Sequence, residues 1–171
     1  MIRVVFVCTA NICRSPMAEG LLKHHWKNQS RTSLMVSSMG IQMIDNQPAS
    51  EHAVAVCAEN GVDISCHRSR ALHPEELQKA NLILAMEPFQ QRHLQLLAPK
   101  LKDKVFLLAK WPEESRRRGV ITDPIGRSLR VYRKIFKVIN GHVQRIIPHL
   151  TASIYKLSDN VFGKARGSPP E

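Results

Sequence analysis

A cysteine and an arginine, Cys8 and Arg14, are the first residues of this chain whose types and spacing suggest chemistry. They lie six positions apart within residues 4–20, which read VVFVCTANICRSPMAEG. A thiolate is a strong nucleophile, and the planar arginine guanidinium can hold two oxygens of a phosphate group at once. Backbone N–H groups of a loop between the two residues can also converge on an anion. The pair therefore suggests nucleophilic attack on a bound phosphate.

The neighbouring residues strengthen this interpretation, because the spacing alone is a weak signal. Residues 2–7 are β-branched or aromatic apart from one arginine, as in a strand buried on both faces of a parallel sheet. Pro16 is placed to begin a helix, whose positive dipole end would point at the anion. Ser15 can donate a hydrogen bond to the thiolate and help it to leave. We therefore predict a phosphate-binding loop after the first strand, with Cys8 as nucleophile and Arg14 binding the phosphate.

Phosphoryl transfer to sulfur also needs an acid that protonates the leaving oxygen. Asp123, in the sequence Ile-Thr-Asp-Pro at residues 121–124, is the best candidate. The proline favours an extended backbone at Asp123, although an Asp-Pro pair is more often a plain turn. The segment lies between the last predicted strand and a long helix, at the expected carboxyl edge of the sheet. We therefore predict that Asp123 is the general acid and base.

Composition places the chain among compact single-domain proteins. It has 171 residues, of which 43% are hydrophobic, and no stretch near the roughly 20 apolar residues of a membrane span. The apolar run at its start is too short for an export signal. We therefore expect a cytoplasmic protein that keeps its four cysteines as thiols. The net charge of +11 favours an anionic partner without choosing among phosphorylated substrates, nucleic acid and acidic lipid.

Short apolar runs alternate with helical patterns along the chain. Strands are predicted at residues 2–7, 34–38, 81–86 and 104–108, and helices at 16–26, 50–60, 72–80 and 89–97. This alternation favours an α/β fold in which helices flank a parallel sheet on both faces. Ligands bind at the carboxyl ends of the strands in such sheets, which is where Cys8 lies.

A long amphipathic helix is predicted over residues 129–147, where apolar residues recur at helical spacing. Pro148 is expected to end or kink this helix. Glycine, proline and serine residues near the C-terminus indicate a loose tail. We therefore divide the chain into one domain over residues 1–157 and a tail over residues 158–171.

The stretch Cys8-Thr-Ala-Asn-Ile-Cys-Arg-Ser-Pro16, followed late in the chain by Asp123-Pro124, resembles the low-molecular-weight protein tyrosine phosphatases. The resemblance extends from the first strand to about residue 147. Further matching motifs are Ser-Ser-Met-Gly at residues 37–40, His-Arg-Ser-Arg at 67–70 and Asn-Leu-Ile-Leu-Ala-Met at 81–86. In this order the set of motifs is highly specific.

This resemblance implies a single three-layer domain with a four-stranded parallel sheet and the catalytic loop after strand one. It implies a phosphocysteine intermediate on Cys8, with Arg14 and Asp123 completing the catalytic set and neither a metal nor another cofactor. The phosphate would also be held by the other loop residues, Thr9, Ala10, Asn11, Ile12, Cys13 and Ser15. The partner would be a phosphorylated protein or a phosphate-like oxyanion.

The resemblance also implies supporting roles for residues near the loop. Asn11 would hold the loop in a strained shape through hydrogen bonds to Ser38 and His67, while Ser15 tunes the thiolate. Under peroxide, Cys13 would form a disulfide with Cys8, as in relatives. A small buried residue is an equally good interpretation of Cys13.

Two substrate classes stay open within the family. Members that act on phosphotyrosine often have aromatic walls beside the loop, where this chain offers Met43, Ile44 and Ile125. Residues 40–54 instead resemble a bacterial subgroup that includes protein arginine phosphatases. The arginine-specific members, however, have a threonine at the position of Ile12, whereas the tyrosine-specific members have a branched apolar residue there. Ile12 therefore favours phosphotyrosine, with protein arginine phosphatase as the alternative.

Two further functions are less well supported. Arsenate reductases of this fold need resolving cysteines after the third strand, and residues 87–100 contain none. A non-catalytic basic domain that binds nucleic acid is disfavoured because only 5% of the residues are aromatic and no recognition motif is present. The run Arg116–Arg118 favours a solvated loop over a substrate-binding patch. No membrane partner is predicted, and the oligomeric state stays open.

Overall fold

The computed structural model describes residues 1–27, 33–42, 44–112 and 119–162, with residues 153–162 as backbone only. Met43 and Arg116–Arg118, which the sequence analysis considered near the site, lie outside the described residues. No helix within this described part combines the length and apolar character that crossing a bilayer requires.

Four parallel strands form one sheet, as the alternation of strands and helices predicted. The strands are β1 (Ile2–Cys8), β2 (Leu34–Gly40), β3 (Leu82–Ala85) and β4 (Val105–Leu107). Their order across the sheet is β2-β1-β3-β4, so β1 lies inside the sheet and β2 at its edge. The register pairs Cys8 with Gly40, and Val7 with Ala85. The carboxyl ends of β1, β2 and β3 therefore meet at one edge of the sheet.

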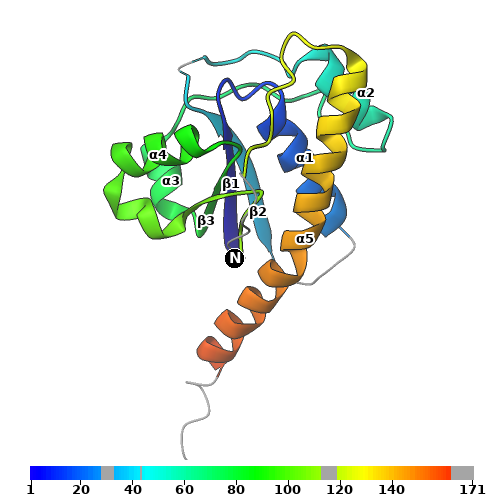
Figure 1. The fold of residues 1–171 in the computed structure, drawn as a ribbon. Helices are drawn as coiled ribbons and strands as arrows, with labels where there is room; N and C mark the ends of the chain where they lie inside the picture. The colour runs from blue at the N-terminus through cyan, green and yellow to red at the C-terminus, as the bar shows by residue number, and fades with distance from the viewer. Residues whose placement is uncertain (28–32, 43, 113–118, 163–171) are drawn as a thin grey trace, which may run out of the picture.

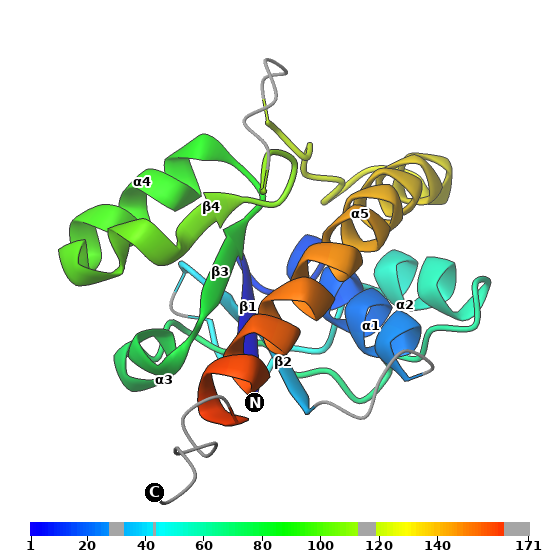
Figure 2. The same cartoon turned by 90° about the horizontal axis from the view of Figure 1, so that it is seen from below.

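Helices cover both faces of the sheet and complete the three predicted layers (Figure 1). One face is covered by α1 (Arg14–Trp26), α2 (Glu51–Ala58) and α5 (Leu129–Phe162). The other face is covered by α3 (Pro74–Lys79), α4 (Pro88–Leu97) and the 3-10 helix η1 (Pro99–Lys104). Figure 2 shows the two groups of helices on opposite sides of the strands.

Strand β1 contributes to two hydrophobic cores, which explains why nearly all of its side chains are apolar. Val4, Phe6 and Cys8 belong to the core shared with α1 and α5. Val5 and Val7 belong to the smaller core on the side of α3 and α4. Successive side chains of a strand point to opposite faces, so a strand between two helical layers needs a continuous apolar run. This double packing gives the loop that begins at Cys8 a rigid base.

Helix α5 continues through Pro148, where the sequence suggested an end or a kink. Three neighbours of the proline are buried in the core: Ile146, Ile147 and Leu150. Their packing offsets the loss of the backbone hydrogen bond that a proline inside a helix removes. The helix runs to Phe162, so residues 158–162 of the predicted tail are helical, and residues 163–171 lie outside the described residues. The division of the chain at residue 157 stays a prediction.

Gly40, the last residue of β2, lies directly against the loop that follows β1. A Cβ atom at this position would lie 3.0 Å from the carbonyl carbon of Ala10 and from the carbonyl oxygen of Thr9, and 3.1 Å from the backbone nitrogen of Asn11. All three atoms belong to the backbone, which cannot turn aside as a side chain can. The missing side chain therefore allows β2 and the loop to approach closely.

Replacing Ile139 by alanine tests the packing of α5 against the sheet. The Ile139 side chain is 0% exposed, so we expect the free energy of unfolding in urea to fall by about 2–5 kcal/mol. The preceding residue, Val138, is 44% exposed, and Val138→Ala should change the free energy of unfolding by less than about 0.5 kcal/mol. Equal losses in the two variants would contradict this orientation of α5.

Candidate active site

The thiol of Cys8 lies at the end of β1, at the start of a loop that closes where α1 begins. Helix α1 begins at Arg14, two residues earlier than Pro16, where the sequence placed its start. The N–H groups of its first turn and its positive dipole end are therefore next to the loop. Cys8 Sγ is 3.0 Å from Ser15 Oγ in a buried contact. The serine hydroxyl can thus stabilise a negative charge on the sulfur.

Asn11 has a left-handed backbone conformation, with a φ angle of 57°. Its Nδ2 donates to Ser15 Oγ at 2.9 Å and to Ser38 Oγ at 2.8 Å. Its Oδ1 accepts from the backbone N–H of Arg70 at 2.9 Å, and its carbonyl oxygen is 2.7 Å from His67 Nε2. Asparagine adopts this conformation at lower cost than most residues, and the four hydrogen bonds hold it there. Both contacts that the family resemblance implied for Asn11 are present.

Ser38 and His67 are in turn held by their own neighbours. Ser38 Oγ donates to Glu19 Oε2 at 2.6 Å, and Glu19 forms an ion pair with Lys23 one turn further along α1. Burial lowers the pKa of His67 below its usual value of 6.5, although the hydrogen bond to Asn11 acts in the opposite direction. The Asn11 carbonyl can only accept, so the neutral ring carries its proton on Nε2. The loop is therefore supported from α1, β2 and the segment before α3.

The Arg14 side chain, only 1% exposed, connects three segments of the chain. Its Nη1 donates to the carboxylate of Glu87 and, at 2.9 Å, to the carbonyl oxygen of Ile121. Its Nη2 donates to the carboxylate of Asp123 and, at 3.4 Å, to Thr9 Oγ1. Its Nε has no hydrogen-bond partner among the residues that the structure describes. One guanidinium thus joins the loop after β1, the start of α4 and the segment before α5.

Asp123 reaches the site from the segment between β4 and α5, where the sequence placed it. One carboxylate oxygen contacts Arg14, and the other accepts from the backbone N–H of Ile125 at 3.0 Å. The Asp123 side chain is 33% exposed, in contrast to the buried guanidinium. The carboxyl group is therefore oriented by its neighbours and still accessible to a group that enters the site. Such a placement suits an exchange of protons with a bound molecule.

Glu87 and Gln90 also belong to the site, although no sequence motif singled them out. Glu87 is the N-cap of α4 and forms a reciprocal capping box with Gln90. Gln90 is fully buried, where its Nε2 donates to Thr9 Oγ1 at 3.1 Å and its Oε1 accepts from the backbone N–H of Met86 at 3.0 Å. The sequence does contain one pattern that could have pointed to these two residues. A glutamate follows the predicted strand directly, and a glutamine three positions later completes the pattern of a capping box.

The thiol of Cys13 is hydrogen-bonded to two hydroxyl groups. Its Sγ is 3.2 Å from Tyr132 Oη and 3.3 Å from Ser50 Oγ. Burial raises the pKa of Cys13 above its usual 9.0 and raises the pKa of Tyr132 to about 12. Both groups are therefore neutral at physiological pH. All four cysteines are free thiols, so the disulfide between Cys13 and Cys8 stays a prediction.

The surface around the loop carries apolar side chains. Ile44 is 39% exposed and Ile125 is 52% exposed, while Phe89, two residues after Glu87, is 51% exposed. Ile12, within the loop, is partly buried against the core under α1. Over the described ranges, no cluster of three or more histidine, cysteine, aspartate or glutamate residues is arranged to hold a metal ion. The apolar surroundings suit a substrate that carries its phosphate on an apolar group.

Comparison with known proteins gives the site a context. Residues 3–156 match the family model described as low molecular weight phosphotyrosine protein phosphatase. Over 149 residues the chain is 34% identical to the probable low molecular weight protein-tyrosine-phosphatase EpsP of Ralstonia nicotianae. This match covers 87% of this chain and 96% of EpsP.

Solved structures of two kinds of phosphatase have a similar fold. The YwlE arginine phosphatase from Geobacillus stearothermophilus has a TM-score of 0.82 at 32% identity, covering 91% of this chain and 97% of that one. A low molecular weight protein tyrosine phosphatase from T. tengcongensis has a TM-score of 0.80 at 37% identity, covering 87% of this chain and 99% of that one. Overall similarity therefore does not separate the two substrate classes.

The partly buried position of His67 predicts that stability falls in mild acid. Because its pKa is lowered in the folded protein, the unfolded chain binds a proton more readily, and stability is lost as the pH falls through about 6.5. In urea unfolding between about pH 7.5 and 5.5, His67→Gln should lose less stability than the wild type, because its amide does not titrate.

His93 on α4 is exposed and supplies the matched control. His93→Gln should retain the pH dependence of the wild type. If His67→Gln also retains it, then His67 is not the group responsible.

Proposed function

The chain belongs to the low molecular weight phosphotyrosine protein phosphatase family, and we propose that it acts as a phosphoric monoester hydrolase that removes phosphate from phosphotyrosine in proteins. One observation carries this proposal: Cys8, Arg14 and Asp123 belong to a single site. Arg14 contacts Asp123 directly, and the loop that Arg14 closes starts at Cys8. A nucleophile, a cation for the phosphate and a proton donor are thereby within reach of one bound group.

Arg14 and the backbone N–H groups of loop residues 9–15 would bind the phosphate. The unpaired Nε of Arg14 supports this role, because a phosphate oxygen offers the acceptor that this buried N–H needs. Glu87 would keep the guanidinium oriented while the phosphate replaces other partners of Arg14. The planar fork then stabilises the negative charge on two phosphate oxygens through the transition state.

In the first chemical step, the Cys8 thiolate attacks the phosphorus atom. A bond forms between Sγ and phosphorus as the bond from phosphorus to the tyrosine oxygen breaks. The carboxyl group of Asp123 gives its proton to that oxygen, so tyrosine leaves as a neutral phenol. The step leaves a phosphocysteine on Cys8 and a carboxylate on Asp123.

In the second step, water attacks the phosphorus atom of the phosphocysteine. The Asp123 carboxylate takes a proton from the water, so the same residue now acts as the base. The bond between phosphorus and sulfur breaks, and inorganic phosphate leaves. Ser15 Oγ, 3.0 Å from Cys8 Sγ, stabilises the thiolate as it is released. No step in this sequence requires a metal ion.

Protein arginine phosphatase is the second candidate, because the YwlE arginine phosphatase matches this fold closely. The proposal of phosphotyrosine rests on Ile12, whose branched apolar side chain resembles that of tyrosine-specific relatives. Phe89, an exposed aromatic residue two positions after Glu87, favours an aryl group. Ile44 and Ile125 stand where phosphotyrosine-specific members often have aromatic walls, so they do not separate the two candidates. The four free thiols are consistent with action in the cytoplasm, where thiols stay reduced.

Hydrolysis of matched phosphotyrosine and phosphoarginine peptides tests the substrate and the nucleophile together. We expect the wild type to prefer the phosphotyrosine peptide and Cys8→Ser to be inactive on both. Ile12→Thr should shift the ratio of the two kcat/KM values toward phosphoarginine by about tenfold. Cleavage of phosphoarginine alone would assign the second candidate instead, and full activity of Cys8→Ser would exclude the mechanism.

Comparing kcat on substrates with poor and with good leaving groups shows whether Asp123 is a general acid or only orients Arg14. Asp123→Asn should lower kcat by about 10²–10⁴-fold on substrates with poor leaving groups, which need a proton. The loss should be much smaller on activated aryl phosphates, whose leaving oxygen needs little protonation. Asp103 in η1 is exposed, and Asp103→Asn should leave both rates unchanged. Equal losses on both kinds of substrate would remove Asp123 from the acid role.

A further inference from the structure

Four carbonyl oxygens of the loop between β1 and α1 accept hydrogen bonds from groups outside the loop. These are the carbonyls of Cys8, Thr9, Asn11 and Ile12, which accept in turn from Ile41 N at 3.1 Å, Gln42 N at 2.8 Å, His67 Nε2 at 2.7 Å and Ser50 N at 2.8 Å. A trans peptide bond is planar, so each C=O and the N–H that follows it point in opposite directions. The N–H groups of Thr9, Ala10, Ile12 and Cys13 therefore point away from the outer donors, toward the inside of the loop.

The four inward N–H groups have no partner in the protein. Within the part of the chain that the structure describes, none of them donates to a protein acceptor. A backbone N–H group in a folded protein needs an acceptor, and a bound phosphate would supply one. The hydrogen bonds on the outside of the loop therefore set the direction of the donors on its inside.

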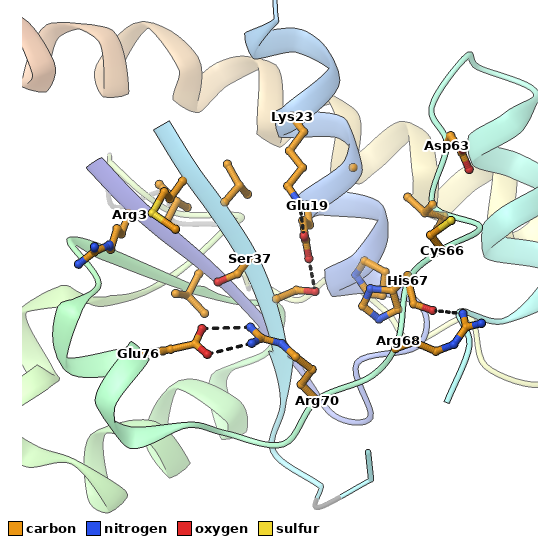
Figure 3. A pocket seen from close by; sticks show the side chains of 18 of the residues that line it. Arg3, Glu19, Lys23, Ser37, Asp63, Cys66, His67, Arg68, Arg70 and Glu76 are labelled. Carbon is orange, nitrogen blue, oxygen red and sulfur yellow. Dashed lines mark hydrogen bonds and ion pairs between the residues drawn. The ribbon is translucent and has the colours of Figure 1, made fainter. Parts of the chain in front are cut away.

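The outer hydrogen bonds have different origins. Two come from the residues directly after β2. The bond to the Asn11 carbonyl comes from the pocket beside β2 that Figure 3 shows, whose walls include His67 and Arg70. The bond to the Ile12 carbonyl comes from Ser50, the N-cap of α2. Ser50 therefore supports the loop separately from the network around Asn11.

Cys13, Ser50 and Tyr132 form a closed ring of hydrogen bonds, which we call the thiol–hydroxyl ring. Cys13 Sγ donates to Ser50 Oγ at 3.3 Å, and Ser50 Oγ donates to Tyr132 Oη at 3.1 Å. The Tyr132 hydroxyl is then left to donate to Cys13 Sγ, which lies 3.2 Å away. Each group gives one proton and accepts one within the ring, and hydrogen bonds linked in this way strengthen one another.

Two helices fix the thiol–hydroxyl ring. Ser50 Oγ also accepts from the backbone N–H of Ala53 at 3.3 Å, at the start of α2. Tyr132 lies on α5 with 2% of its surface exposed, and its aromatic side chain meets that of His52 edge-on at a centroid distance of 5.3 Å. The peptide bond before Cys13 is therefore held on both sides, at its carbonyl by Ser50 and at its nitrogen through the Cys13 side chain.

We propose that Tyr132 and Ser50 are positioning residues for the phosphate-binding loop. Tyr132 acts through Ser50 and Cys13, and it keeps the Cys13 N–H directed at the phosphate. Without the tyrosine hydroxyl the N–H stays in the loop but its direction varies, which weakens the binding of phosphate in substrate and product alike. The effect on phosphate binding is independent of the proposed function, whereas the effect on KM rests on it.

Tyr132→Phe tests this role, because it removes the hydroxyl and keeps the aromatic side chain. Titration of the full chain with inorganic phosphate, followed in amide NMR spectra, gives the Kd of phosphate in the loop. Tyr132→Phe should raise this Kd by about tenfold, and raise KM for a phosphotyrosine peptide by a similar factor at a similar kcat. Ser50→Ala should raise both in the same way, and Ser50→Thr, which keeps a hydroxyl, should restore them.

Ile139→Ala is the matched control for a loss of stability. Ile139 lies in the core on α5 and takes no part in the thiol–hydroxyl ring. A destabilised fold reduces the amount of active protein, which lowers the apparent kcat and leaves Kd and KM as they are. Ile139→Ala should therefore bind phosphate as the wild type does.

Three results would overturn the positioning role. These are no phosphate-dependent shift of the amide signals of residues 9–13 in the wild type, an unchanged Kd in Tyr132→Phe, and an equal rise of Kd in Ile139→Ala. If Tyr132→Phe does not fold, the Ser50 variants decide, and the same Kd in Ser50→Ala as in the wild type overturns the role.

The positioning role and the proposed function can fail independently. If Tyr132→Phe weakens phosphate binding but the wild type cleaves no phosphotyrosine peptide, the proposed function fails and the role of Tyr132 stands. If the wild type cleaves the peptide and Tyr132→Phe binds phosphate equally well, the role of Tyr132 fails and the proposed function stands.

Discussion

The left-handed backbone at Asn11 is the constraint on which the rest of the site depends. A non-glycine residue in this conformation costs roughly 1–2 kcal/mol, so it persists only where its surroundings fix it. Ser15, Ser38, His67 and Arg70 do so with four hydrogen bonds, and they come from α1, β2 and the segment before α3. The shape of the loop therefore depends on the whole edge of the sheet.

The second constraint is the burial of the Arg14 charge. Removing one partner of a buried ion pair is strongly destabilising, because it leaves a charge without compensation. Here Glu87 and Asp123 compensate the guanidinium from different segments of the chain. Glu87 is fixed by the capping box of α4, whereas Asp123 lies on a partly exposed turn. Glu87, which is held in place, is therefore suited to orient the arginine. Asp123, which is more accessible, is suited to exchange protons with a substrate.

Much of the fold could be predicted because the sequence patterns that indicate its strands and helices are local. The apolar run of β1 and the amphipathic face of α5 follow from which side chains must be buried on one or two sides. Of the two effects predicted for Pro148, an end or a kink of the helix, the end is contradicted, for a reason that is not local. The penalty of a proline is offset by core contacts of its neighbours, which depend on where the helix lies in the folded protein. The boundaries of short elements such as α3 depend on tertiary contacts in the same way.

For the site, the sequence by itself determined that Cys8, Arg14 and Ser15 share a loop, because residues so close along the chain must lie together. It also placed Asp123 at the correct edge of the sheet, since connections before a helix in a parallel sheet come to that edge. Only the tertiary structure decided that Glu87 and Gln90 join the site, because this requires β3 to lie beside β1. Strand order depends on how two cores pack around the sheet, and no short stretch of sequence contains that information.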